Sequence, residues 1–175
     1  SGPLKLLFPP EIFESFLGYF LVNNLYGSLV VNRQSRFSAE DFRNHSQVLR
    51  EDLQLKINNL LPWRGFSYPC TSEGVPGGEM VLISDGKLRS PILNVKYGKK
   101  FGLPPTPLPA GGRGIFLETA SQILPWRELI KTVDRGMIVL SVLGLHTQDS
   151  SSGSFSLTAD QGLLVEDGQI KGKIK

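Results

Sequence analysis

Side chains able to do acid–base, nucleophilic or metal chemistry are scarce in this sequence, which contains two His and one Cys. His146 precedes Gln148 and Asp149 in a predicted loop, where its imidazole could polarise a bound group. Cys70 lies near Glu73 and could serve as a nucleophile or a metal ligand. Because the spacing supplies no adjacent base or second ligand, we favour a solvated His146 and a buried or half-buried structural Cys70.

Two further patterns carry weak chemical signals. His45 lies in Asn44-His45-Ser46, which is formally an N-glycosylation sequon but means little in a sequence without a secretory signal. The run Gly111-Gly112-Arg113-Gly114 could form an anion-binding nest, although a pliant loop before a strand is the simpler interpretation. The sequence contains no HExxH, CxxC, GxGxxG or GxSxG pattern and no phosphate-binding loop. The residues by themselves therefore predict no catalytic, cofactor-binding or metal site.

The composition is that of a folded globular chain. Its 175 residues are 40% hydrophobic and 20% charged, with a mean hydropathy of -0.06. This length predicts a single domain over residues 1–175 with a core that needs no disulfide or metal. The net charge of +3 does not imply nucleic-acid binding. The sequence has no long apolar run and no signal peptide, and Cys70 is alone, so we expect a cytoplasmic protein without a membrane span.

The elements that would position a site begin with a predicted helix over residues 11–26. Apolar residues recur at spacings of one, three and four and form one broad face: Ile12, Phe13, Phe16, Leu17, Phe20, Leu21 and Leu25. Pro10 suits a first helical turn, and Gly27 is predicted to end the helix. Ser38 and Asp41 form a capping-box pattern, which predicts a second, short helix over residues 39–49.

Alternating polarity and turn residues predict strands next. Leu53, Leu55 and Ile57 alternate with polar residues and indicate a half-buried strand. The runs 80–89 and 163–171 each contain Asp-Gly, the pair that supplies both positive-φ positions of a type I′ turn. We therefore predict two β-hairpins, with Asp85-Gly86 and Asp167-Gly168 at their tips.

The remaining patterns complete an α+β prediction. They indicate helices over 95–101 and 125–133, strands over 115–118 and 136–143, an irregular segment over 103–114, a loop over 150–154, and closing antiparallel strands from residue 155. The predicted fold is one long amphipathic helix packed on a curved, mostly antiparallel β-sheet or partial barrel. The start at Ser1-Gly2 without Met and the strand-like pattern up to Lys175 predict a fragment of a larger protein.

Several stretches, taken in order, resemble the TldD/PmbA family, also called modulators of DNA gyrase. Residues 68–76 (YPCTSEGVP) are similar to the family's F-D-x-E-G-V loop, and residues 81–88 (VLISDGKL) follow at the family's spacing. Residues 99–103 (KKFGL) resemble its A-R-K-L-G stretch. The family's closing signature is matched in three pieces, residues 135–144, 152–156 and 162–170.

The resemblance implies a part in a cytoplasmic zinc peptidase. TldD-type members carry an HExxxH zinc helix, whereas PmbA/TldE-type members lack it and pair with a TldD-type subunit. In the best register of the first helix, Gly18, Tyr19 and Asn23 stand where the motif has His, Glu and His. Glycine and tyrosine cannot supply a zinc-bound imidazole and a general base. The resemblance thus implies a zinc-less, non-catalytic subunit that partners a TldD-type subunit in peptide processing and holds no cofactor.

The sequence also departs from the family pattern at Thr71-Ser72 and at Ser154, where the family has Asp. Two alternatives stay open: a stand-alone module that binds peptide or nucleic acid, and an independent hydrolase that uses Cys70 or His146. The aromatic residues of the first helix form an apolar surface wider than one buried face needs. We therefore expect weak dimerisation through helix 11–26, in preference to the edge strand near Lys175.

Overall fold

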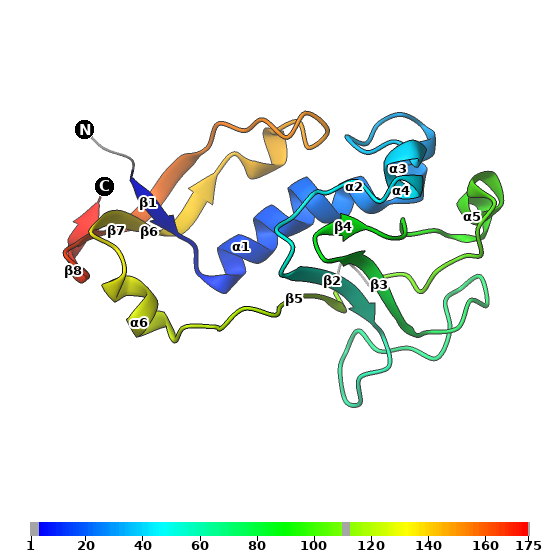
Figure 1. Ribbon diagram of the computed structural model, residues 1–175, viewed down its shortest axis with the longest axis horizontal. Helices are drawn as coiled ribbons and strands as arrows, with labels where there is room; N and C mark the ends of the chain where they lie inside the picture. Colours follow the sequence, from blue (N-terminus) through cyan, green and yellow to red (C-terminus); the bar gives the residue numbers. More distant parts are fainter. Residues whose placement is uncertain (1–3, 110–112, 175) are drawn as a thin grey trace. The chain divides into compact units, whose positions relative to one another are not determined.

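The computed structural model describes residues 4–109 and 113–174 (Figure 1). The chain divides into two compact units, and the first is built from two separate stretches, Ser1–Leu21 and Ile123–Lys175. The second unit, Val22–Gln122, is continuous in sequence. Each unit contains one four-stranded sheet, so the fold is mixed α and β. The predicted combination of helices with mostly antiparallel strands is confirmed, but the strands form two sheets where one was predicted, and neither sheet closes into a barrel among the described residues.

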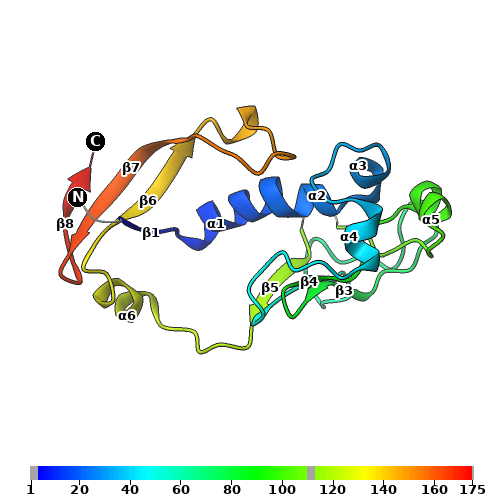
Figure 2. The same cartoon turned by 45° about the horizontal axis from the view of Figure 1, so that its top comes forward.

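The sheet of the first unit has the order β1-β6-β7-β8 (Figure 2). Its strands are β1 (Lys5–Leu7), β6 (Arg135–Leu143), β7 (Thr158–Glu166) and β8 (Gln169–Ile174). Strand β1 runs parallel to β6, and the other two pairings are antiparallel. Helix α6 (Trp126–Lys131) contributes to the core of this unit, whose members are Leu7, Ile130, Val133, Ile138, Leu163 and Val165.

The sheet of the second unit has the order β4-β3-β2-β5, and all its pairings are antiparallel. Its strands are β2 (Leu53–Asn58), β3 (Glu79–Ser84), β4 (Lys87–Leu88) and β5 (Ile115–Thr119). The described residues of this unit form four short helices: α2 (Asn23–Leu25), α3 (Gly27–Val31), α4 (Ala39–Arg43) and α5 (Val95–Phe101). The fully buried side chains of this core include Leu25, Leu55, Ile57, Leu82, Ile83, Leu88 and Leu93.

The first helical stretch is not one regular α-helix. It consists of α1 (Pro10–Phe16), a π-helical segment (Leu17–Val22) and α2 (Asn23–Leu25). Gly27 was expected to end the helix, but the chain turns at Tyr26 and Gly27 begins α3. A side chain at Gly27 would clash, because its Cβ would lie 2.3 Å from Cδ2 of Leu93, and the Gly27 amide donates to the Ile92 carbonyl at 2.8 Å. Glycine is thus required at this position for a close contact.

The other local predictions mostly agree with the structure. The capping box forms, because the Ser38 hydroxyl accepts from the Asp41 amide and the Asp41 carboxylate accepts from the Ser38 amide. The helix that follows ends at Arg43 and not at residue 49, since His45 has a left-handed φ of 50°. Helix 95–101 matches α5, and residues 103–109 are irregular, while 110–112 lie outside the described residues.

Both Asp-Gly pairs occupy hairpin tips, as the sequence predicts. Asp85 and Gly86 join β3 to β4 with φ of 53° and 68°, and Asp167 and Gly168 join β7 to β8 with φ of 49° and 71°. The first tip is bonded to the segment that leads into β2: the Gly86 amide donates to the Leu53 carbonyl at 3.0 Å. In return, the Gly86 carbonyl accepts from the amides of Val48 and Leu49 at 2.9 and 3.0 Å.

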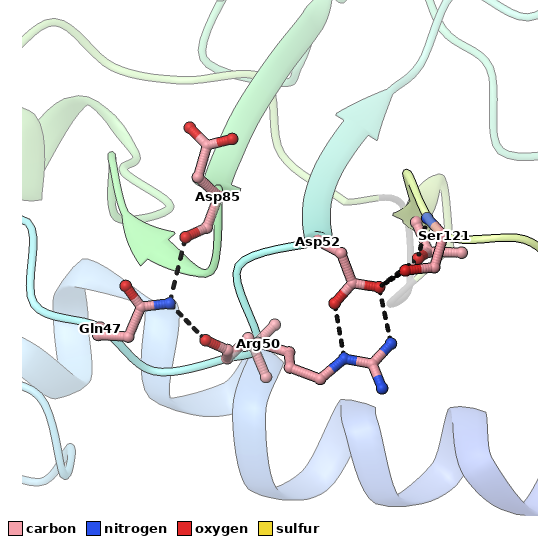
Figure 3. A network of polar contacts seen from close by, with 7 residues as sticks. Gln47, Arg50, Asp52, Asp85 and Ser121 are labelled. Atoms are coloured by element: carbon pink, nitrogen blue, oxygen red, sulfur yellow. Dashed lines mark hydrogen bonds and ion pairs between the residues drawn. The ribbon is translucent and has the colours of Figure 1, made fainter.

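Side chains reinforce this junction (Figure 3). Gln47 donates from Nε2 to the Asp85 carbonyl at 3.2 Å. Arg50 forms a two-point ion pair with Asp52, with its Nε and a terminal nitrogen 2.6 and 2.7 Å from the two carboxylate oxygens. The hydroxyls of Thr119 and Ser121 donate to the same carboxylate at 2.7 and 2.6 Å. Asp52 therefore joins the turn before β2 to the end of β5.

These donors set the charge state of Asp52. Hydrogen bonds from Arg50, Ser121 and Thr119 hold the pKa of its carboxyl well below the ordinary value. The charged carboxylate is thus the form that the folded chain stabilises.

We predict that Gly86→Ala destabilises the second unit by about 3 kcal/mol. Its new Cβ would lie 2.2 Å from the Leu49 carbonyl oxygen and 2.6 Å from that of Arg50. Gly102 is the matched control, because it also has a positive φ but open space around its Cβ position, so Gly102→Ala measures the backbone cost alone, about 1 kcal/mol. Urea unfolding followed by circular dichroism measures both variants, and equal losses would contradict the steric explanation.

We also predict that the stabilisation by Asp52 depends on pH. A depressed carboxyl pKa contributes stability that is complete above the ordinary value of about 3.9 and is lost as the pH falls toward the pKa of the folded chain. Asp52→Asn should therefore lower the urea midpoint at pH 7, and its difference from the unmutated chain should shrink below about pH 4. Glu51→Gln, at the exposed neighbouring residue, is the control. A difference that stays constant down to pH 2 would refute the assignment.

Candidate functional site

The three residues that sequence reasoning singled out for chemistry are divided between the two units. His45 is exposed after α4, with Nδ1 2.8 Å from the Leu88 carbonyl oxygen. The expectation of a buried or half-buried Cys70 was wrong, because this residue is exposed in the loop between β2 and β3 of the same unit. His146 belongs to the first unit and is exposed in a short 3-10 turn, Leu145–Thr147. Within residues 4–109 and 113–174, no group of three or more His, Cys, Asp or Glu is placed to hold a metal ion.

The neighbour proposed for Cys70 has another partner. The Glu73 carboxylate accepts a hydrogen bond from the Val95 amide at the start of α5, at 3.0 Å. The loop itself is closed by backbone bonds, since the Thr71 amide donates to the Val75 carbonyl at 2.7 Å. The Thr71 hydroxyl accepts from the Val75 amide at 3.1 Å. Thr71 thus takes a structural role at a position where the sequence departs from the family pattern.

The positions that the predicted register assigns to a zinc motif lie along the first helical stretch. Gly18 and Tyr19 are in the π-helical segment, and Asn23 is the first residue of α2. Residues five apart come to the same face of a π-helix, because its hydrogen bonds join residues i and i+5. The spacing of five that an HExxxH motif needs therefore fits the backbone. The side chains do not fit zinc, since glycine offers no ligand and an amide stands in place of the second imidazole.

Tyr19, at the position of the motif's general base, is used to hold a loop. Its hydroxyl donates to the Gln148 carbonyl, and the His146 carbonyl oxygen lies 3.3 Å away. The same loop is closed by Gln148, whose side-chain amide donates to the Gly144 carbonyl at 3.0 Å and accepts from the Ser156 amide at 2.9 Å. A phenol that is engaged with backbone carbonyls cannot act as a carboxylate base. Tyr19 therefore has a structural role in this chain, because its hydroxyl holds the 144–148 loop.

An apolar pocket of about 360 Å³ lies beside this loop in the first unit. Nine of its ten lining residues are apolar: Leu6, Phe8, Phe16, Met137, Val139, Val142, Phe155, Leu157 and Ala159, with Ser156. Phe155 packs against Phe16 and Phe20 at centroid distances of 5.6 and 5.3 Å. Part of the aromatic surface of the helix is thus covered within this unit, while Phe13 remains 44% exposed. The pocket can accept an apolar group but supplies no acid or base.

An acidic pocket of about 240 Å³ in the second unit is lined by Glu51, Asp52, Asp85 and Glu118, among others. Paired carboxylates could perform acid–base catalysis, but three of these four form ion pairs with Arg or Lys side chains. Asp52 binds Arg50, Glu118 lies 2.8 Å from Nζ of Lys56, and Asp85 lies 3.4 Å from Arg89. This pocket is therefore part of the ion-pair network of the sheet.

The proposed anion nest lies partly outside the described residues, since Gly111 and Gly112 are not among them. Gly114 has a positive φ of 81°, and a Cβ there would lie 2.7 Å from Oδ1 of Asn59. Asn59 is fully buried and donates to the Tyr68 hydroxyl at 2.7 Å and to the Leu108 carbonyl at 3.0 Å. Burial raises the pKa of the Tyr68 phenol. No pattern in the sequence indicated this polar cluster, which fixes the base of the 59–68 loop.

Known proteins resemble this chain in sequence and in fold. A curated protein of Buchnera aphidicola, named Metalloprotease PmbA homolog, is 28% identical over 179 residues, which cover 97% of this chain and 37% of that protein. TldE from Thermococcus kodakarensis is 23% identical with a TM-score of 0.78, over 96% of this chain and 39% of that one. A protein of Thermotoga maritima, described as a candidate modulator of a DNA gyrase, is 25% identical with a TM-score of 0.79, over 100% of this chain and 41% of that one.

The chain thus spans about two fifths of the length of the relatives it matches. Among the helices of the described residues, none is long and apolar enough to cross a membrane. The sequence matches the family described as PmbA/TldA metallopeptidase C-terminal domain over residues 1–175. With a fold shared by the solved structures, this match over every residue shows that the chain belongs to the PmbA/TldA metallopeptidase C-terminal domain family.

Proposed function

We propose that this chain is the zinc-less, PmbA/TldE-type subunit of a TldD/TldE-type peptidase, and that it contributes surface and substrate enclosure without a catalytic group. The observation that carries the proposal is that Gly18, Tyr19 and Asn23, which the predicted register assigns to the zinc motif, lie on a backbone whose π-helical turn suits the motif's spacing. The Tyr19 hydroxyl bonds the 144–148 loop, so the position has a new structural use.

The names of the relatives support the peptidase connection. One is named a metalloprotease homolog and another is named TldE. The apolar pocket of the first unit would take an apolar side chain of a peptide, which is the substrate class that we propose. We assign the protein to the cytoplasm, because a single exposed thiol at Cys70 suits a reducing compartment. Dimerisation of the isolated chain through helix 11–26 stays a prediction.

We predict that the purified chain binds no stoichiometric zinc, because its helix lacks both imidazoles of the motif. The double variant Gly18→His/Asn23→His restores two of the three protein ligands of a catalytic zinc site, so it should bind zinc more tightly than either single variant, and a side chain at Gly18 meets no atom within 4 Å. Metal content after equilibration with zinc and removal of excess metal measures both proteins. Each single variant is a control, because one imidazole binds zinc weakly. Stoichiometric zinc on the unmutated chain would overturn the proposal.

We further predict that the chain co-purifies with a TldD-type subunit from native extract, and that this association changes little between 50 and 300 mM salt. The stand-alone nucleic-acid module gives the opposite pattern, because displacement of phosphate counterions makes DNA binding fall steeply with salt. Fluorescence anisotropy with labelled DNA, over the same salt series, measures that alternative. Steep DNA binding without a TldD-type partner would replace our proposal with the stand-alone module.

A hydrolase based on Cys70 or His146 finds no support in the contacts around either residue. Glu73 is bound to the Val95 amide, and His146 is exposed in a turn. Any peptidase activity of the purified chain that is lost on Cys70→Ala or His146→Ala would revive this alternative.

A further inference from the structure

A second apolar pocket, of about 340 Å³, lies in the second unit and takes no part in the proposed function. It is formed by the end of α3, the start of α4 and the loop between these helices (Figure 1). Half of its lining residues are apolar, namely Val30, Val31, Phe37 and Ala39, and the others are Arg33, Ser35, Arg36 and Ser38. The lining therefore combines an apolar surface with two cations and contains no carboxylate.

The two cations of this pocket are not neutralised by the described part of the chain. Arg33 and Arg36 are exposed, and neither forms an ion pair with a described Asp or Glu. The guanidinium carbon of Arg36 lies 5.6 Å from the centroid of the Phe37 ring. Phe37 is itself buried and packs edge-on against Phe42. A planar cation beside an aromatic ring suits an anion that carries an apolar group.

Arg33 occupies a backbone position that favours glycine. Its φ is 58°, and its amide donates to the Val30 carbonyl at 3.2 Å. The Gln34 amide donates to the Leu29 carbonyl at 2.8 Å. These two bonds form the Schellman motif that ends a helix, in which the left-handed residue is usually glycine. Glycine would relieve the strained backbone but would supply no cation, so the guanidinium is kept beside the pocket at a cost in stability.

A buried side chain fixes the loop that carries these residues. Asn24 in α2 is fully buried, and its Oδ1 accepts from the Arg36 amide at 2.8 Å. The Asn24 carbonyl accepts from the Ser35 hydroxyl at 2.7 Å, and that hydroxyl accepts from the Phe37 amide at 2.9 Å. The backbone of Arg36 and Phe37 is thus held before any ligand arrives, which lowers the entropy cost of binding.

We propose that this pocket binds a carboxylate attached to an apolar or aromatic group, with Arg33 and Arg36 binding the carboxylate and Phe37 contacting the apolar part. Guanidinium groups match the planar carboxylate through paired N–H donors. A neutral apolar ligand would leave both cations without a counterion, and inorganic phosphate would leave the apolar lining unused. A free organic acid and the C-terminus of a peptide both present this chemistry. The inference does not depend on the proposed function, because it uses only contacts within the second unit.

The experiment titrates the chain with 3-phenylpropionate and follows the backbone amide signals by NMR. We expect the amides of Arg33, Phe37 and Ala39 to shift, with a Kd on the order of 1 mM for a ligand of this size. The neutral 3-phenylpropionamide has the same shape and should bind at least about 10-fold more weakly, because the charge-assisted hydrogen bonds are lost.

Two substitutions separate binding from stability. Arg33→Gly should raise the urea midpoint, because glycine relieves the left-handed backbone, and should weaken binding about 10-fold, because one cation is lost. Arg36→Gln should weaken binding by a similar factor without raising the midpoint. Arg43→Gln is the matched control for charge, because Arg43 is exposed at the end of α4 and does not line the pocket. This variant should bind as the unmutated chain does.

The remaining arms identify the source of the carboxylate. A tripeptide Ala-Ala-Phe that binds more tightly than 3-phenylpropionate, and that loses this advantage when its C-terminus is amidated, would assign the site to a peptide end. Equal or weaker binding of the tripeptide would assign it to a free organic acid.

Three results would overturn the inference. The first is equal affinity for the acid and the amide, or binding that neither Arg33→Gly nor Arg36→Gln weakens. The second is tighter binding of inorganic phosphate than of the acid at the same amides. The third is binding to this chain that disappears in a longer protein that contains it, which would replace the ligand with a carboxylate of the same polypeptide.

Discussion

The second unit depends on one close approach between backbone atoms, at Gly86. The turn between β3 and β4 sits so near the segment before β2 that a single added carbon would overlap the Leu49 carbonyl. This approach lets one glycine bond Val48, Leu49 and Leu53. Strand β4 is continuous with the turn, and the Leu88 amide donates to the Ser46 carbonyl, so the contact also fixes the chain that leaves α4. Short strands and short helices are thereby held in one cooperative arrangement.

The hairpin tip of the first unit is also held by hydrogen bonds to another segment of the chain. The Asp167 amide donates to the Asp134 carbonyl at 2.8 Å, and the Gly168 amide donates to the Val133 carbonyl at 2.9 Å. The tip of the second hairpin is therefore bonded to the chain just after α6. In both units, the type I′ turn is therefore hydrogen-bonded to a neighbouring segment of the same unit. The acidic residue before each glycine tolerates the left-handed backbone that this geometry requires.

The structural features that could be predicted are those that depend on residues close together in the sequence. Both Asp-Gly turns, the Ser38–Asp41 capping box and helix 95–101 follow from local chemistry, and the structure confirms them. The prediction that Gly27 ends the helix was wrong. Glycine is needed there because a side chain would clash with Leu93, a contact that only the structure reveals. The division into two sheets depends on pairings between distant strands, which periodicity alone does not specify. At the candidate site, the register that assigns Gly18 to the zinc motif stays a prediction. The bond from Tyr19 to the 144–148 loop could not be predicted, because it joins residues far apart in the chain.

The chain order of the two units has a consequence for how the protein acquires its fold. Strand β1 pairs with β6, with Lys5 opposite Gly136, while the whole second unit lies between them in the sequence. During synthesis from the N-terminus, the second unit can therefore complete its sheet while β1 still has an unpaired edge. Closing so long a loop is entropically costly, and contacts of this range slow folding. Strand β1 is thus synthesised before the second unit but paired after it, and until then its short length limits the pairing of its exposed edges with other chains.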